Sequence, residues 1–159
     1  MGSIQSVLKS DEYIQEGVSP HGGAIVLACT VGDDYDEPKN RILVYRNDEW
    51  IDFTSAGESV LSIDASREGQ AYVLGENGTV IEFEWAARSA ESLRSSRRLF
   101  RNDKVERIGP LRRLRLVSGA VYCAGSGGQL YRLNDGGFQP LSRLKVLGRS
   151  LTIEDITGY

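Results

Sequence analysis

Apolar and polar residues alternate in several short runs of this chain. The alternation is clearest in VLSID (60–64), TVIEF (79–83) and QLYRL (129–133). A period of two places successive side chains on opposite faces of a strand, so these runs predict β-strands with one face more buried than the other. Two further runs, YIQEGVS (13–19) and LRRLRLV (111–117), predict strands that precede strand pairs. The pattern therefore predicts an all-β fold.

The thirteen residues 71–83 recur without a gap at 121–133. The two copies share a tyrosine in the second position and glycines in the fifth and eighth positions: Tyr72 and Tyr122, Gly75 and Gly125, Gly78 and Gly128. Each copy predicts a strand, a glycine-containing turn and a second strand. This order is that of a β-hairpin.

The repeat extends to a second strand pair. Residues 41–50 align without a gap on 129–138, and both segments have a strand, a polar turn and an aromatic residue. The turns are Asn47-Asp48 in one segment and 134–137 in the other. These residue types tolerate a positive φ angle, so we expect them to close hairpins.

The repeats divide the chain into units of up to four antiparallel strands. We expect three units, at about 13–55, 58–103 and 106–145, within one domain that spans 1–159. A single strand at 150–156 opens a fourth unit and ends the chain. The AIVL, AYVL and AVYC strands recur every 47–50 residues, close to the period of about 40–50 residues that propeller blades show.

Two insertions interrupt this regularity. The segment 32–40 lengthens a hairpin in the first unit, and the segment 85–104 lengthens the end of the second. In the second insertion, Ala86, Ala87, Ala90 and Leu93 favour a short helix. A strand that ends at 97–100 is the alternative.

The segments GQAYVLG (69–75) and GAVYCAG (119–125), followed by Asn77-Gly78 and Gly127-Gly128, resemble repeats of the broad kelch or WD class of β-propellers. The resemblance covers most of residues 13–156, although it lacks a Trp-Asp dipeptide and a Gly-His opener. It implies four-stranded antiparallel blades. Propellers close with about four to eight blades, so three units leave two arrangements: a half-propeller completed as a six-bladed ring by dimerisation, or an open β-repeat array.

The charge of the chain is divided along its length. Residues 1–87 hold five basic and sixteen acidic side chains, a net charge of −11, whereas residues 88–150 hold fourteen basic and four acidic ones, a net charge of +10. Such a division suggests a charged protein partner, or a second copy that meets the first head to tail. Solvated faces of one domain that neutralise each other are the simpler interpretation.

Two charged clusters are candidate partner-binding sites. One is the acidic loop Asp33, Asp34, Asp36 and Glu37, and the other lies in a basic run between 94 and 115, with Arg97, Arg98, Arg101, Arg112 and Arg113. The acidic loop lacks the alternating spacing of a calcium-binding loop, so we expect no metal. The basic run contains Phe100 as its only aromatic residue, and nucleic-acid platforms interleave several aromatic residues. As a binding partner we therefore expect an acidic protein surface and not a nucleic acid; an ordinary solvated face is the alternative interpretation of the basic run.

The sequence offers little for catalysis. His21 is the only histidine and lies in a turn signature, SPHGG (19–23), so no second histidine completes a catalytic triad or a metal site. Cys29 and Cys123 lie in apolar runs and are expected to be buried free thiols, with a disulfide as the alternative. We expect no catalytic residues and no cofactor.

These observations predict a non-enzymatic protein–protein interaction module, with an inhibitor or immunity-type protein that masks its partner as a narrower hypothesis. The alternatives are a propeller-type hydrolase or lyase and a structural subunit of a larger complex. We expect self-association and cytoplasmic residence. No stretch approaches the roughly 18 apolar residues that a membrane helix needs, so no membrane partner is expected.

Overall fold

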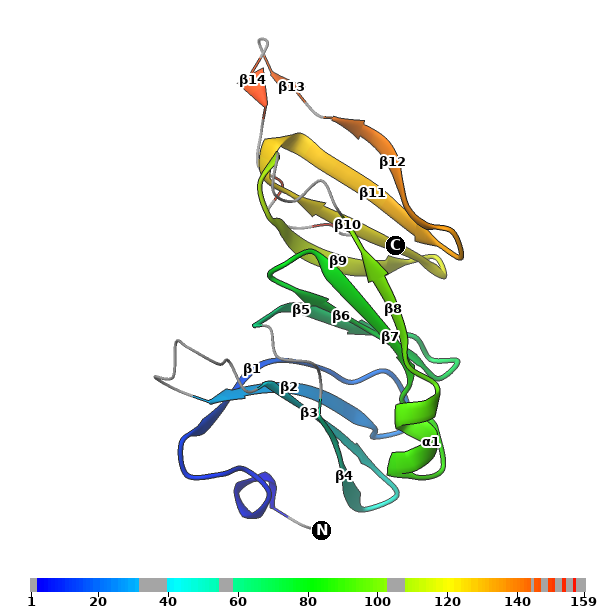
Figure 1. Ribbon diagram of the computed structural model, residues 1–159. Helices are drawn as coiled ribbons and strands as arrows, with labels where there is room; N and C mark the ends of the chain where they lie inside the picture. The colour runs from blue at the N-terminus through cyan, green and yellow to red at the C-terminus, as the bar shows by residue number, and fades with distance from the viewer. Residues whose placement is uncertain are drawn as a thin grey trace.

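The protein contains three four-stranded antiparallel sheets. The computed structural model describes residues 3–31, 40–54, 59–102, 108–143, 145–146, 149–150, 153 and 156. Figure 1 shows the sheets as layers stacked in chain order, with the first sheet beside the N-terminus and the second between the other two. The predicted all-β class with antiparallel four-stranded repeats is confirmed. Within the described residues, none of the sheets closes into a barrel.

In the first sheet, each strand pairs with the next along the chain. Its strands are β1 (Glu12–Val18), β2 (Ile25–Val31), β3 (Asn40–Arg46) and β4 (Glu49–Thr54). The β3–β4 turn places Asn47 at φ 49° and Asp48 at φ 60°. The prediction that this pair closes a hairpin through positive φ angles is confirmed.

The second sheet repeats this order. Its strands are β5 (Val60–Ala65), β6 (Gln70–Gly75), β7 (Thr79–Glu84) and β8 (Arg98–Arg101). The insertion before β8 forms helix α1 (Ala90–Ser95), whose first turn is capped by the Ser89 hydroxyl, which accepts a bond from the Ser92 N–H. The two alternatives for this insertion therefore both occur, one after the other.

The third sheet has the same order again. Its strands are β9 (Leu111–Val117), β10 (Ala120–Gly125), β11 (Gln129–Asn134) and β12 (Gly137–Arg143), and the short 3₁₀ helix η2 (Ser126–Gly128) connects β10 to β11. A small hairpin of β13 (Lys145–Val146) and β14 (Arg149–Ser150) follows.

The predicted terminal strand 150–156 falls largely outside the described residues. Ser150 belongs to β14, whereas Ile153 and Ile156 lie outside strands. The Ile153 N–H donates to the Gly125 carbonyl at 3.0 Å, so the chain returns to the end of β10 at this point.

Two apolar clusters hold the sheets together. The cluster between the first and second sheets contains Val26 and Val44 from one sheet and Val73 and Phe83 from the other. The cluster between the second and third sheets contains Leu74, Phe100, Cys123, Tyr131 and others. Because each sheet buries one face against the next, burial of apolar surface drives the stacking.

The N-terminal segment packs on the other face of the first sheet. This segment begins with the 3₁₀ helix η1 (Ile4–Ser6), and Ile4, Val7 and Leu8 pack against a buried cluster of Leu27, Cys29 and Leu43. Ile14 of β1 pairs with Cys29 and is 43% exposed, so the segment covers the centre of this face and not all of it.

A β-bulge recurs at the first strand pair of all three sheets. The register shifts between Ile14 and Glu16 in β1, between Val60 and Ser62 in β5, and opposite Ala124 and Gly125 in the third sheet. The repeat seen in the sequence therefore includes this backbone irregularity, which bends the strand and increases its twist.

Gly125 lies at the bulge of the third sheet, where a side chain has no room. A Cβ atom there would lie 2.3 Å from the Pro110 carbonyl oxygen and 2.6 Å from the Leu111 Cα. Both neighbours are backbone atoms that no rotamer change moves aside. We expect Gly125→Ala to lower the free energy of unfolding by about 1–3 kcal/mol, measured by urea denaturation. Gly136→Ala is the matched control, because Gly136 has no positive φ and a Cβ there would meet only the Asn134 Oδ1, at 3.5 Å. An equal loss in both variants would contradict the steric explanation.

Candidate functional site

The fold divides the basic run between two edges of the sheets. Arg98 and Arg101 lie on β8, the outer edge strand of the second sheet, whereas Arg112 and Arg113 lie on β9, an edge strand of the third. β9 packs against β5, and β12 packs against β8. We call the β1, β5 and β9 side the inner edge and the β4, β8 and β12 side the outer edge. The predicted basic residues therefore form two separate groups, both at the junction of the second and third sheets.

On the outer edge, Arg98 connects the two sheets. Its Nη1 donates to Asp135 Oδ1 at 2.8 Å, its Nη2 donates to the Asp135 carbonyl at 2.6 Å, and its guanidinium lies 4.7 Å from the Phe100 ring centroid. Arg98 thus holds the β11–β12 turn in place. Arg101 is exposed and makes no ion pair within the described residues, and the Nε of Arg97 is buried without a hydrogen-bond partner there.

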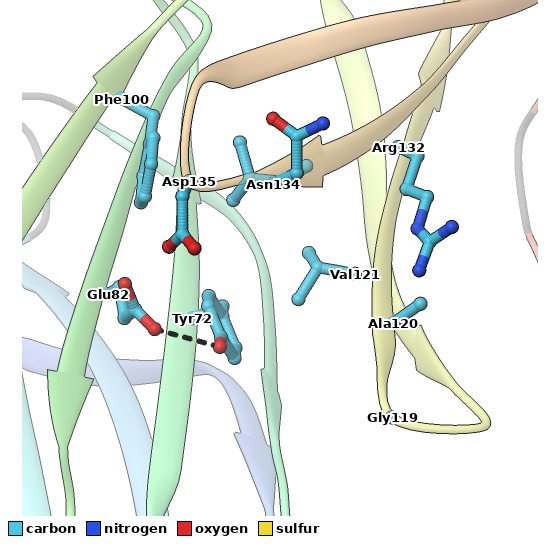
Figure 2. Close-up of a pocket in the computed structure, with 10 residues that line it drawn as sticks. Tyr72, Glu82, Phe100, Gly119, Ala120, Val121, Arg132, Asn134 and Asp135 are labelled. Carbon is cyan, nitrogen blue, oxygen red and sulfur yellow. Dashed lines mark hydrogen bonds between the residues drawn. The ribbon is translucent and has the colours of Figure 1, made fainter.

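Beside Arg98 the junction contains a hollow of about 230 Å³, shown in Figure 2. We call it the Tyr72 hollow. Its lining residues are Tyr72, Glu82 and Phe100 from the second sheet and 119–121 with 132–135 from the third. The Tyr72 hydroxyl donates to Glu82 Oε1 at 2.9 Å. Burial, and then this hydrogen bond to a carboxylate, raises the pKa of Tyr72, so its hydroxyl stays protonated at neutral pH.

On the inner edge, charged side chains from all three sheets meet. Glu16 of β1 accepts the Ile63 N–H of β5 at 2.8 Å, and its other oxygen lies 3.1 Å from Arg113 Nη1 and 3.7 Å from Arg115 Nη1. Arg115 also donates to the Ser62 hydroxyl at 3.2 Å. Asp64 of β5 accepts the Leu116 N–H at 2.8 Å. In each case, a carboxylate from one sheet receives a backbone N–H from the first strand of the next.

Arg112 and Arg113 line a second hollow, of about 450 Å³, at the inner edge. We call it the Arg112 hollow, and its other lining residues are Leu61, Glu76, Asn77 and Pro110. Arg113 is held by Glu16, whereas Arg112 is exposed and has no ion-pair partner in the part of the chain that the structure describes. The hollow therefore combines the guanidiniums of Arg112 and Arg113 with the Glu76 carboxylate, the Asn77 amide and the apolar side chains of Leu61 and Pro110.

The structure also places the residues that bear on catalysis. His21 lies in the β1–β2 turn, as predicted, where its carbonyl accepts the Ala24 N–H. Cys29 and Cys123 are buried free thiols, which confirms that prediction. Burial raises the pKa of the Cys29 thiol to about 11 and that of Cys123 to about 12, so neither is a thiolate nucleophile at neutral pH. Among the described residues, no group of His, Cys, Asp or Glu side chains is placed to hold a metal ion.

The acidic loop predicted as a partner site, Asp33, Asp34, Asp36 and Glu37, lies outside the described residues. Sequence reasoning did not identify Glu16 and Asp64, which connect consecutive sheets. No described helix is both long and apolar enough to cross a membrane.

Comparison of the chain with models of protein families, with curated proteins and with solved structures found no match.

Proposed function

We propose that this chain is a non-enzymatic protein–protein interaction module in which propeller-like blades form a rigid scaffold. Three properties support this function. Each sheet is connected to the next by apolar packing and by carboxylate-to-backbone hydrogen bonds. The buried thiols are protonated. Arg98, Arg101 and Arg112, which are exposed, lie on edge strands. A rigid scaffold that carries exposed charged groups at its edges is suited to binding another protein surface.

The Arg112 hollow is the single observation on which this proposal depends. Arg113 is oriented by Glu16, and Arg112, which is exposed, lines the same hollow with Leu61 and Pro110. Arginine is enriched among the residues that dominate binding energy at protein interfaces, because it combines charge, hydrogen-bond donors and an apolar stem. An acidic segment with neighbouring apolar side chains has the complementary chemistry.

The partner in this proposal is a different protein. A ring closed head to tail by two copies would bring the third sheet of one copy against the first sheet of the other, where Ile4, Val7 and Leu8 pack. Self-association, predicted from the charge division, stays a prediction.

The proposal is tested by binding a fluorescent decapeptide of alternating glutamate and leucine to the purified chain. We expect saturable binding that weakens as salt is added, because exposed charges are screened. We expect Arg112→Glu to weaken the binding about tenfold or more, which corresponds to about 1.4 kcal/mol, since it replaces an attractive charge with a repulsive one. Fluorescence anisotropy measures the change.

Arg67→Glu is the matched control, because Arg67 is exposed in the β5–β6 turn and makes no ion pair within the described residues. Its affinity for the peptide should stay within about twofold of the original chain, as is usual for a charge outside an interface. A lysine–leucine decapeptide should not bind. If the acidic peptide fails to bind, or if Arg112→Glu and Arg67→Glu weaken its binding equally, the Arg112 hollow is not a protein-binding site and the proposed function loses its support.

A further inference from the structure

One row of side chains crosses the second sheet and faces the third. The strand register places Asp64 opposite Tyr72, Tyr72 opposite Glu82 and Glu82 opposite Arg98. All four members of this row take part in polar contacts, which join the sheets or connect members of the row. Asp64 accepts the Leu116 N–H, Tyr72 donates to Glu82, and Arg98 binds Asp135. This row is therefore the polar part of a sheet-to-sheet contact.

The third sheet has a row in the equivalent position. Arg115 lies opposite Tyr122, Tyr122 opposite Arg132 and Arg132 opposite Gln139. The equivalence follows the sequence repeat, in which Tyr72 matches Tyr122. The alternate residues Val121, Cys123, Tyr131 and Leu133 belong to the cluster that packs on the second sheet. Tyr122 and Arg132 therefore lie on the opposite, outer face of the third sheet.

Arg132 is also one of the residues that line the Tyr72 hollow, and Figure 2 shows it across Val121 from Tyr72, Glu82 and Phe100. Arg132 and Gln139 are exposed, and Tyr122 is half-buried. Leu141 of β12 is 48% exposed, which adds an apolar side chain to the outer edge strand of the same sheet. We call Tyr122, Arg132 and Gln139 the outer row.

The outer row differs from the row of the second sheet in its charge and in its partners. Arginine replaces an acidic residue at two positions, with Arg115 in place of Asp64 and Arg132 in place of Glu82. Arg115 turns to Glu16 and Ser62 inside the molecule. Within the described residues, the Arg132 guanidinium and the Tyr122 hydroxyl have no hydrogen-bond or ion-pair partner, whereas Tyr72 and Glu82 bond each other.

We infer that the outer row is the docking surface for an acidic segment of the partner protein, an inference that rests on the proposed function. In this contact, Arg132 pairs with a carboxylate, and the Tyr122 hydroxyl and the Gln139 amide donate to further oxygen atoms. Charge complementarity identifies the partner, because Arg132 is an exposed cation that makes no ion pair within the described residues, whereas Arg113 and Arg115 of the same sheet are already paired with Glu16.

The test uses the intact chain, labelled with ¹⁵N, and the same glutamate–leucine decapeptide, followed by ¹H–¹⁵N NMR titration. We expect the largest shift changes at the amides of Tyr122, Arg132 and Gln139, separate from changes at Arg112 and Arg113. We expect Arg132→Glu to weaken the binding that the outer-row amides report by about tenfold. Tyr122→Phe keeps the ring and removes only the hydroxyl, and we expect it to weaken the same signals by a few fold.

The controls separate this inference from the proposed function. Arg67→Glu should leave the affinity reported by the outer-row amides unchanged. Arg112→Glu should weaken only the binding that the amides of residues 112 and 113 report. If the peptide shifts only Arg112 and Arg113, and Arg132→Glu has no effect, the inference is overturned while the proposed function stands. If the peptide shifts neither group, both are overturned. Stronger outer-row shifts with a ten-nucleotide oligothymidine than with the peptide would also overturn it, since they assign the row to nucleic acid.

Discussion

Replacing Glu12 by alanine is expected to lower the free energy of unfolding by about 3–5 kcal/mol, the usual cost of removing one partner of a buried ion pair. Glu12 and Arg41 are 1% and 10% exposed at their side chains. Arg41 Nε donates to Glu12 Oε1 at 2.8 Å, and its other nitrogens reach Asp52 at 3.0 Å and the Val7 carbonyl at 2.8 Å. Without Glu12, a buried guanidinium would lose its main counter-charge.

The loss of stability would extend beyond the ion pair, because the same contacts hold the N-terminal segment against the first sheet. Glu12 Oε2 also accepts the Lys9 N–H at 3.0 Å, and Arg41 binds the Val7 carbonyl. Residues 4–8, which cover Leu27 and Cys29, are therefore held by this network as well as by apolar packing. We expect amide hydrogen exchange of residues 4–12 to accelerate in Glu12→Ala.

Urea denaturation measures the change in stability, and Asp11→Asn is the matched control. Asp11 is the adjacent residue, is exposed, and makes no ion pair within the described residues, so its replacement should change the free energy of unfolding by less than about 0.5 kcal/mol. Glu12→Gln keeps the shape of the side chain and removes its charge, and we expect an intermediate loss. A loss in Glu12→Ala no larger than that of Asp11→Asn would show that the pair is not a stabilising contact.

The same pair predicts a pH dependence. Burial alone would raise the pKa of Glu12, but the hydrogen bonds from Arg41 and the Lys9 N–H, with the attraction of both cations, lower it below its ordinary value of 4.5. The unfolded state then binds a proton at a higher pH than the folded state. The contribution of Glu12 is therefore complete well above pH 4.5 and is lost as the pH falls through the folded-state pKa. In Glu12→Gln this part of the acid destabilisation should disappear.

Replacing Phe83 by alanine is expected to cost about 3–5 kcal/mol, as large-to-small changes of buried aromatic residues do. Phe83 lies on β7, is 0% exposed, and belongs to the cluster that joins the first and second sheets. Truncation removes apolar contacts to both sheets and leaves a cavity that the neighbouring strands cannot fill, because their backbones are fixed by the ladder hydrogen bonds. The effect should therefore reach both sheets.

Leu99→Ala is the control for Phe83→Ala, since Leu99 is an apolar strand residue in the same sheet but is 51% exposed. We expect it to change the midpoint of urea denaturation only slightly. Tyrosine and tryptophan fluorescence and far-ultraviolet circular dichroism should give one coincident transition in both variants, because the sheets share their cores. Two separate transitions would contradict the joint core of the first and second sheets.

The sequence predicted the strands well, and there is a physical reason. VLSID, TVIEF and QLYRL alternate with a period of two, and such runs lie in β5, β7 and β11. The repeated tyrosines and glycines also marked equivalent positions, since Tyr72 and Tyr122 hold the same place in their rows and Gly75 and Gly125 both lie beside a bulge. Alternation and turn residues are local properties of the chain, so they can be recognised in a single sequence.

The candidate site was only partly predictable. Arg112 and Arg113 were identified from the basic run, but the sequence alone did not separate them from Arg98, which lies on the other side of the sheet stack. Glu16 was not identified, because its role depends on Arg113, a residue 97 positions away. Contacts of this kind depend on how the sheets stack, and no local pattern reports that.

The sequence by itself determined the all-β class, the antiparallel order and the repeated unit. Alternation, turn residues and repeat spacing are properties of the order of residues along the chain, so they can be recognised without the fold. Only the tertiary structure decided which charges meet. Stacking placed Glu16 and Asp64 against the backbone of the next sheet, and packing brought Ile4, Val7 and Leu8 onto the first sheet. In the third sheet it left Arg132 and Gln139 exposed. These outcomes depend on packing between residues far apart in the chain, where burial and pairing set the energy of each charge.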